Sequence, residues 1–244
     1  MVKQDSAVCR IGTSGYHYDH WQPVFYPTGL PKQKWFDYYA EIFDTVEINN
    51  TFYKLPKSET FDLWRERSFK GFQYALKFSR YGTHMKKLKS PSQIIRTFLS
   101  RAERLKSFLG PILVQLPPHW GADPKRLKGF LREAPASHRW AIEFRDPDWL
   151  REEVYNVLHS YNAALCIHDM LKDHPKLLTT DWTYLRFHGN GYSGSYSRES
   201  LSTWARWIDD RLANGNDVYA YFNNDAEGNA VKDALSLRED LFGE

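Results

Sequence analysis

Four charged side chains of this sequence each lie singly inside a short apolar run. The runs read VEI, LKF, IEF and LRF, and the charged residues are Glu47, Lys77, Glu143 and Arg186. Burying an ionised side chain in such a setting is costly unless a second charge or a ligand pairs with it. We therefore expect these positions to form a functional pocket rather than an ordinary core.

The cations near these positions favour an anionic ligand. Lys77, Arg145 and Arg186 supply fixed positive charges, and His188 can polarise or protonate what they hold. Ammonium and guanidinium groups are the usual partners of phosphate and carboxylate in proteins. We expect a phosphate-bearing ligand, either a small anion such as a nucleotide or a single-stranded nucleic acid.

The carboxyl groups are candidates for acid–base catalysis. Glu47 and Glu143 can share this work if dry surroundings keep one of them protonated, as in glycosidases. They can instead ligate a divalent metal together with His168, Asp169 and His188, but the cations interleaved among these residues would repel it. We therefore predict Glu47, Glu143 and His188 as catalytic residues, with no cofactor and no metal ligand.

Eight runs rich in Val, Ile, Leu, Tyr and Phe are predicted to be the strands that position these side chains. Segments with helical periodicity separate most of them, the clearest being 90–110 and 197–215. Asp123, Asp148 and Asp225 indicate three further helix starts. The predicted strands are 8–12, 45–49, 73–79, 111–116, 139–145, 163–168, 182–188 and 218–223.

The spacing of these elements indicates the fold. Dividing 244 residues by eight gives about 30 residues per unit, which is the size of a βαβ element. The sequence therefore predicts an α/β protein, a single (β/α)8 TIM barrel over residues 1–244 with an aromatic-rich first βα loop. An open doubly wound sheet is disfavoured, because the first turn, GTSG, lacks the spacing of a dinucleotide-binding loop.

Alternation along the strands gathers the polar residues on one face. Successive side chains of a strand point to opposite faces, so Glu47 and Asn49 oppose their aliphatic neighbours. In a barrel the polar face is the interior, and most of these residues lie near the carboxyl ends of the strands, where barrel active sites form. Side chains that we expect to orient neutral groups of a ligand are Gln115, Tyr221, Asn223 and Asn224.

The predicted βα loops carry aromatic and basic residues. The loop 80–89, RYGTHMKKLK, is basic and lies where a phosphate chain would approach. Exposed rings in these loops would be stacking platforms, whereas we expect Trp21 and Trp149 to close the end of the barrel. The aromatic residues are Tyr16, Tyr18, Trp21, Trp120, Trp149, Tyr192 and Tyr196.

Composition excludes several other classes of protein. A hydrophobic share of 42% and a net charge of +3 exclude a disordered chain. No run approaches the roughly 18 apolar residues of a membrane-spanning helix, so we expect a cytoplasmic protein without a membrane partner. Cys9 and Cys166 lie in apolar runs without ligand spacing, which argues against a disulfide framework or zinc site. The oligomeric state is not predicted.

Six ordered motifs resemble those of the YecE-like family, a domain of unknown function. They are WQPVFYP, VEINNTFYKLP, VQLPP, IEFRDPDW, LRFHGNGYSGSYS and YFNNDAEGNA, and together they extend over nearly the whole chain. The resemblance implies a TIM barrel and adds Tyr53 to the ligand-binding residues. The chain departs from the family pattern at Asp146 and Asp233. Motif positions are Glu47, Asn49, Thr51, Tyr53, Gln115, Glu143, Arg145, Arg186, His188, Gly189, Asn223, Asn224 and Asp225.

Three functions compete at this point. The leading hypothesis is an enzyme that binds a phosphate-bearing ligand at the barrel mouth and uses Glu and His for proton transfer. The second is a sugar or sugar-acid isomerase, lyase or hydrolase, whose binding would be insensitive to salt. The third is a non-catalytic binding barrel, favoured if the two glutamates lie far apart, each locked to an arginine, with no room for a ligand.

Overall fold

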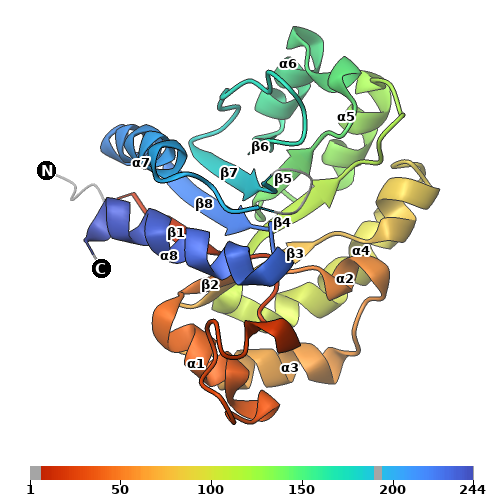
Figure 1. Ribbon diagram of the computed structural model, residues 1–244. Coiled ribbons are helices and arrows are strands. Elements are labelled where there is room, and N and C mark those ends of the chain that lie inside the picture. The colour runs from red at the N-terminus through yellow and green to blue at the C-terminus, as the bar shows by residue number, and fades with distance from the viewer. Residues whose placement is uncertain (1–6, 190–193, 244) are drawn as a thin grey trace, which may run out of the picture.

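Eight parallel strands form one sheet that curls into a nearly closed barrel (Figure 1). The structure, a computed structural model, describes residues 7–189 and 194–243. The strand order is β1-β8-β7-β6-β5-β4-β3-β2, and β1 meets β2 through the single bridge between Ser14 and Glu47. The strands are β1 (Cys9–Thr13), β2 (Thr45–Ile48), β3 (Gln73–Lys77), β4 (Leu109–Gln115), β5 (Trp140–Glu143), β6 (Ala164–His168), β7 (Trp182–Phe187) and β8 (Asp217–Phe222).

The helices surround these strands, as a (β/α)8 barrel requires (Figure 1). Each predicted strand is confirmed to within two residues at either end. The unit after β6 differs from the expected repeat, because residues 169–181 form a loop without a helix. The helices are α1 (Trp35–Ile42), α2 (Asn50–Tyr53), α3 (Ser58–Arg67), α4 (Pro91–Ala102), α5 (Pro124–Glu133), α6 (Glu152–Ser160), α7 (Arg198–Ala213) and α8 (Asn229–Phe242).

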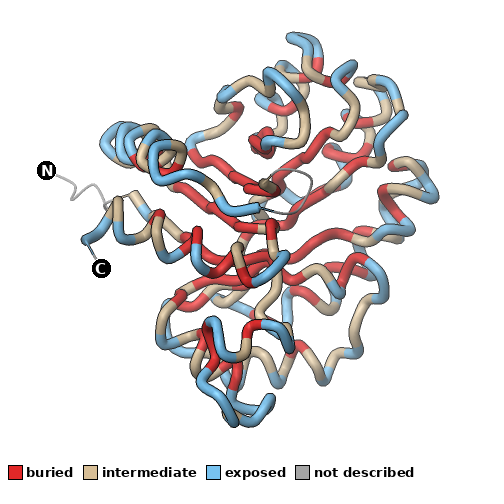
Figure 2. Tube along the Cα trace, in the orientation of Figure 1, coloured by how far each residue is buried: buried red, intermediate tan, exposed pale blue. Residues whose placement is uncertain are grey.

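The strands divide their side chains between two packed layers, as the alternation predicts. Figure 2 shows the strands buried along most of their length. Leu76 and Leu185 belong to the large apolar cluster that includes helix residues such as Phe98. A second cluster, which includes Ala75 and Tyr184, consists of strand residues alone and fills the barrel interior. Lys77 and Arg186 follow these two residues at a spacing of two and therefore share the interior face.

A predicted helix start coincides with a side-chain cap at Asp123 but not at Asp148 or Asp225. Asp123 accepts a hydrogen bond from the amide of Arg126 at 3.0 Å, which starts α5 as predicted. Asp225 directly precedes a 3-10 helix, Ala226–Gly228, that leads into α8, whereas Asp148 lies inside the 3-10 helix Pro147–Trp149 and α6 begins only at Glu152. Asp148 accepts a hydrogen bond from the amide of Ala122 at 2.8 Å, and Asp225 accepts one from the indole of Trp21 at 2.6 Å. Both carboxylates are thus engaged in tertiary hydrogen bonds rather than in helix caps.

Aromatic rings close the carboxyl-terminal end of the barrel. Trp21 and Trp149 are fully buried, which confirms that they pack rather than form exposed platforms. The ring of Trp149 stacks on Phe144 at 4.9 Å. Tyr16 and Tyr18 are half-buried against the same core. Tyr192 lies outside the described residues.

Candidate functional site

One arginine bridges two glutamates inside the barrel. Arg186 of β7 is 1% exposed, and its two terminal nitrogens lie 2.7 Å from Glu47 Oε1 and 2.7 Å from Glu143 Oε2. Glu143 of β5 also pairs with Arg145. Each carboxylate comes from a different strand, and the barrel brings them together across its axis. Arg186 is therefore a counter-ion of the interior rather than a group that faces a ligand.

Two further residues hold Glu47, and the sequence analysis missed both. The hydroxyl of Tyr184 donates to Glu47 Oε2 at 2.7 Å, and Ser14 donates to Oε1. Asn49 Nδ2 donates to Ser14 Oγ at 2.6 Å. The signal for Tyr184 was its position two residues before Arg186, on the same face of β7. Ser14 directly follows β1, at the end of the barrel where sites form.

Both glutamates are held in the ionised form. Burial alone would raise the pKa of Glu143, but Arg186 and Arg145 outweigh it and hold this pKa well below its usual range. Burial acts in the same direction on Glu47, where Arg186 and Lys77 bring the pKa below its usual value. The expectation that dry surroundings keep one glutamate protonated is therefore wrong: burial came with a paired guanidinium.

His188 is a neutral imidazole whose tautomer is fixed by its neighbours. Its Nδ1 lies 3.1 Å from Asp169 Oδ1, and its Nε2 lies 3.0 Å from Arg145 and 3.2 Å from Arg186. Guanidinium groups only donate, so Nε2 is the acceptor and Nδ1 carries the proton. Burial, opposed by the Asp169 hydrogen bond and supported by Arg186, lowers the pKa of His188. The ring therefore holds no proton at the nitrogen that faces the arginines.

Lys77 differs from the arginines because no carboxylate binds it. It ends β3 and is 8% exposed, and its Nζ lies 4.6 Å from the centre of the Phe52 ring. Within residues 7–189 and 194–243, this Nζ makes no hydrogen bond or ion pair at contact distance. Burial and the neighbouring Arg186 lower the pKa of Lys77 to about 8. The barrel thus keeps a buried ammonium group whose counter-ions are not in contact with it.

The other predicted residues separate into those at the mouth and those in the wall. Asn49, Gln115, Arg145 and Asn223 are half-buried, and Tyr53 of α2 is 75% exposed. Tyr221 and Asn224 are fully buried. The Tyr221 hydroxyl lies 2.7 Å from Thr45 Oγ1, and Asn224 Nδ2 donates to Asp233 at 2.7 Å. Tyr221 and Asn224 are therefore engaged in hydrogen bonds within the protein.

The family of the chain follows from its sequence as a whole. The model of the family described as "Protein of unknown function DUF72" matches residues 10–244. The chain belongs to the DUF72 family. It is 32% identical to the Escherichia coli protein YecE over 114 residues, which are 46% of this chain and 41% of that protein. The match therefore spans less than half of the length of this relative.

Solved structures support the fold of this DUF72 chain. A DUF72 family protein of Thermotoga maritima superposes with a TM-score of 0.88 at 27% identity, covering 96% of this chain and 99% of that one. A D-psicose 3-epimerase of Clostridium cellulolyticum, solved with D-tagatose, superposes with a TM-score of 0.55 at 12% identity, covering 95% of each chain. The second likeness concerns the barrel fold alone.

A groove opens beside the charged cluster of the DUF72 barrel. Its volume is about 370 Å³, and it lies between the first βα loop, the end of β2 and α3. Asn49 belongs to both sites: it lines the groove, and its Nδ2 lies 3.4 Å from Glu47 Oε1. Asn49 directly follows β2, whose last residue, Ile48, pairs with Leu76 next to Lys77. The groove residues are Gly15, Tyr16, His17, Tyr18, Ile48, Asn49, Asn50, Thr60 and Trp64.

The described part of the chain contains neither a cluster of metal ligands nor a membrane-spanning helix. Across those residues, no three or more His, Cys, Asp or Glu side chains are placed to share a metal ion. Glu47 and Glu143 are instead occupied by arginine, and His168 Nε2 bonds the carbonyl of Phe144 at 2.7 Å.

None of the helices in the same residues has the length and apolar character needed to cross a bilayer.

Proposed function

We propose that this protein is an enzyme that binds a small phosphate-bearing ligand, such as a nucleotide, at the carboxyl-terminal mouth of the barrel. The observation that carries the proposal is Lys77, a nearly buried ammonium group without a contacting carboxylate. A bound anion would replace the solvation that burial has removed from this group. Arg145, whose side chain is 9% exposed, is the second cation near the mouth.

Proton transfer is assigned to His188 rather than to the glutamates. Glu47 and Glu143 stay ionised and serve as counter-ions that fix Arg186. His188 is neutral and is oriented by Asp169, which is the arrangement of a general base. A phosphate at the mouth competes for the guanidinium of Arg145, which leaves Arg186, at 3.2 Å, as the donor to Nε2. Nε2 accepts a proton from the ligand or from water by exchanging this longer contact.

The binding step is tested by calorimetric titration with adenosine 5′-monophosphate and with inorganic phosphate. We expect wild-type binding to weaken between about 50 and 200 mM salt, because charge carries it. Lys77→Met should weaken binding at least about tenfold, the loss expected for one charge-assisted contact. Lys128→Met on the exposed face of α5 is the matched control and should bind as wild type does. Equal binding by wild type and Lys77→Met would overturn the proposal.

A sugar or sugar acid is the second candidate, because the groove presents aromatic rings and amide groups side by side. Tyr18 and Trp64 offer faces for a sugar ring, and Asn49 and Asn50 offer hydrogen bonds. Titration with D-ribose and D-glucuronate, followed by tryptophan fluorescence, tests this candidate. It predicts binding that is independent of salt for ribose and lost in Trp64→Ala. Phosphorus-31 NMR of bound adenosine monophosphate separates an enzyme, which changes it, from a non-catalytic binding barrel.

A further inference from the structure

Three large apolar side chains are exposed beside the mouth on two neighbouring segments. Tyr53 of α2 is 75% exposed, and Tyr81 and Met85 are 47% and 66% exposed on a π-helical turn over Tyr81–Met85. The two segments follow β2 and β3, which are adjacent strands. We call this surface, residues 50–54 and 80–89, the β2–β3 rim. Exposed apolar groups gathered at one place usually mark a binding surface.

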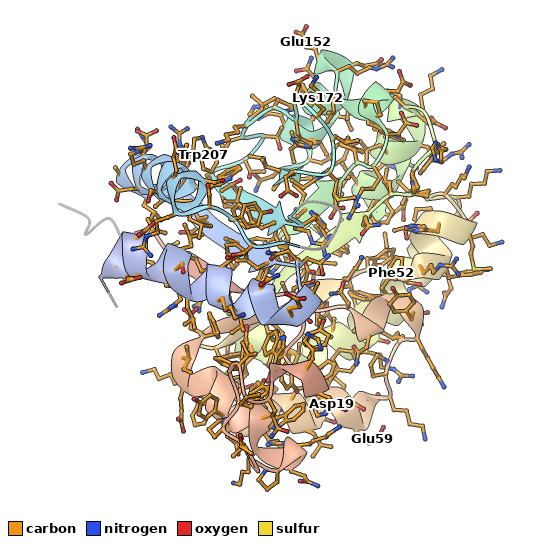
Figure 3. The ribbon with its side chains drawn as sticks, viewed as in Figure 1. Asp19, Phe52, Glu59, Glu152, Lys172 and Trp207 are labelled. Atoms are coloured by element: carbon orange, nitrogen blue, oxygen red, sulfur yellow. The ribbon has the colours of Figure 1, made fainter. Side chains whose placement is uncertain are left out.

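Ring contacts join the rim to Lys77. The ring of Phe52 lies 5.1 Å from the ring of Tyr53, 5.1 Å from that of His84 and 4.6 Å from Lys77 Nζ. Phe52, labelled in Figure 3, is therefore the wall that the rim and the mouth share. Lys77 and the exposed rings of the rim are thus in contact with the same side chain, Phe52, or with its neighbours.

The rim carries positive charge without compensation. Arg80, Lys86 and Lys89 are exposed, and none of them forms an ion pair with another described residue. The sequence has no Asp or Glu between Glu66 and Glu103. Lys86 Nζ lies 5.5 Å from the centre of the Tyr81 ring, so cations and rings alternate on this surface. This combination matches a partner with flat rings on a polyanionic backbone.

We propose that the β2–β3 rim binds single-stranded nucleic acid. Bases stack on Tyr53 and Tyr81, and phosphates lie against Arg80, Lys86 and Lys89. A duplex hides its base faces, and an acidic peptide would leave the exposed rings unused, so an unpaired strand fits the surface best. The inference rests on the proposed function, in that the phosphate at Lys77 belongs to the same strand.

The test is fluorescence anisotropy with a labelled oligothymidylate of about 12 nucleotides, a length within the range of known single-strand sites. We expect Tyr53→Ala/Tyr81→Ala to weaken binding about tenfold or more, the effect of losing stacked bases. Lys86→Gln/Lys89→Gln should reduce the slope of log affinity against log salt by about 1.4, since each phosphate contact on a single strand contributes about 0.7. An oligomer of the same charge that carries abasic sites should bind the wild-type protein as weakly as the thymidine oligomer binds Tyr53→Ala/Tyr81→Ala.

Matched controls lie far from the rim. Phe69→Ala removes an aromatic ring that is 51% exposed and precedes β3, at the opposite end of the barrel. Lys70→Gln/Lys106→Gln removes two exposed charges that precede β3 and β4, at the same opposite end of the barrel. Both controls should bind the oligomer as wild type does, and circular dichroism confirms that all variants fold. Equal binding by the rim variants and these controls, or by the abasic and thymidine oligomers, would contradict the inference.

The same set of proteins separates this inference from the proposed function. If Lys77→Met loses adenosine monophosphate while wild type does not bind the oligomer, the mouth binds an anion and the rim inference fails. If the oligomer binds through the rim and Lys77→Met changes neither ligand, strand binding by the rim stands, but the placing of a strand phosphate at Lys77 fails together with the proposed role of Lys77. Vesicles of anionic lipid that bind better than the oligomer, through the same rim residues, would assign the surface to a membrane and overturn the inference.

Discussion

At the scale of single residues, the interior of this barrel is an ion cluster organised by Arg186. Alternation along the strands predicted that Glu47, Glu143 and Arg186 share one face. It could not predict that one guanidinium bonds both carboxylates, because the contact crosses the barrel and depends on how deep each residue lies. Lys77 has the same parity yet no contacting partner, a difference that only the closed barrel reveals.

Removing Arg186 should strongly destabilise the protein. Arg186→Met leaves buried Glu47 without a contacting guanidinium and buried Glu143 with Arg145 alone, and we expect the free energy of unfolding in urea to fall by about 3–5 kcal/mol. Arg132→Met, whose side chain is 73% exposed on α5, is the control and should change it by less than about 1 kcal/mol. Adding Glu47→Gln and Glu143→Gln to Arg186→Met should restore much of the loss. A small effect of Arg186→Met alone would contradict the ion cluster.

We expect Lys77 to lower the free energy of unfolding while it contributes to ligand binding. Its pKa in the folded protein, about 8, lies below the unfolded value of 10.5, so the charged form is disfavoured by folding. The cost is present below pH 8 and is relieved as the pH rises from about 8 to 10.5. We expect Lys77→Met to be more stable than wild type by about 1–3 kcal/mol at pH 7 and the difference to shrink at pH 10. Urea titrations at both pH values measure this, and a less stable Lys77→Met at pH 7 would refute it.

At the scale of elements, local signals succeeded where the side chain had no stronger distant partner. Asp123 and Ser197 cap α5 and α7 as their positions predict. The segment 90–110, in contrast, is α-helical only to Ala102 and continues as a 3-10 helix over Glu103–Phe108, and Gly110 lies within β4 rather than at a helix end. Ser90 precedes Pro91 of α4 but makes no cap hydrogen bond and has a φ of 46°. Periodicity gives the existence of an element more securely than its ends.

The caps provide a paired prediction. Asp123→Ala removes a hydrogen bond to an orphan amide and should lower the free energy of unfolding by about 1 kcal/mol. Ser90→Ala removes no hydrogen bond and should change it by less than about 0.5 kcal/mol. Thermal or urea unfolding of both variants decides the matter. Equal losses would show that the side chain of Ser90 supports α4 after all.

At the scale of the whole molecule, the first and last βα loops are fastened together where the barrel closes. The indole of Trp21 donates to Asp225 Oδ1 at 2.6 Å, and Ser14 of the first loop bridges to Glu47. The aromatic content of the first loop predicted its packing across the barrel, but the contact with Asp225 joins residues 204 positions apart. The net charge of +3 does not reveal the basic rim, because acidic residues elsewhere balance it; the local run 80–89 predicted it instead.

A double-mutant cycle tests this fastening. Trp21→Phe removes the donor and should lower the free energy of unfolding by about 1–3 kcal/mol. Asp225→Asn should cost less in the Trp21→Phe background than in wild type, with a coupling energy of about 0.5–3 kcal/mol. Additive losses in urea unfolding would mean that the two loops are held by other contacts.

The most direct test of the binding site is an NMR titration of the Lys77 side chain with and without phosphate. Comparison with Lys77→Met assigns its signal among the lysines. We expect Lys77 to have a pKa of about 8 in the free protein. This pKa should rise when phosphate binds, because a neighbouring anion stabilises the ammonium form. A Lys77 that titrates like an ordinary exposed lysine, or whose pKa stays unchanged when phosphate is added, would contradict the account.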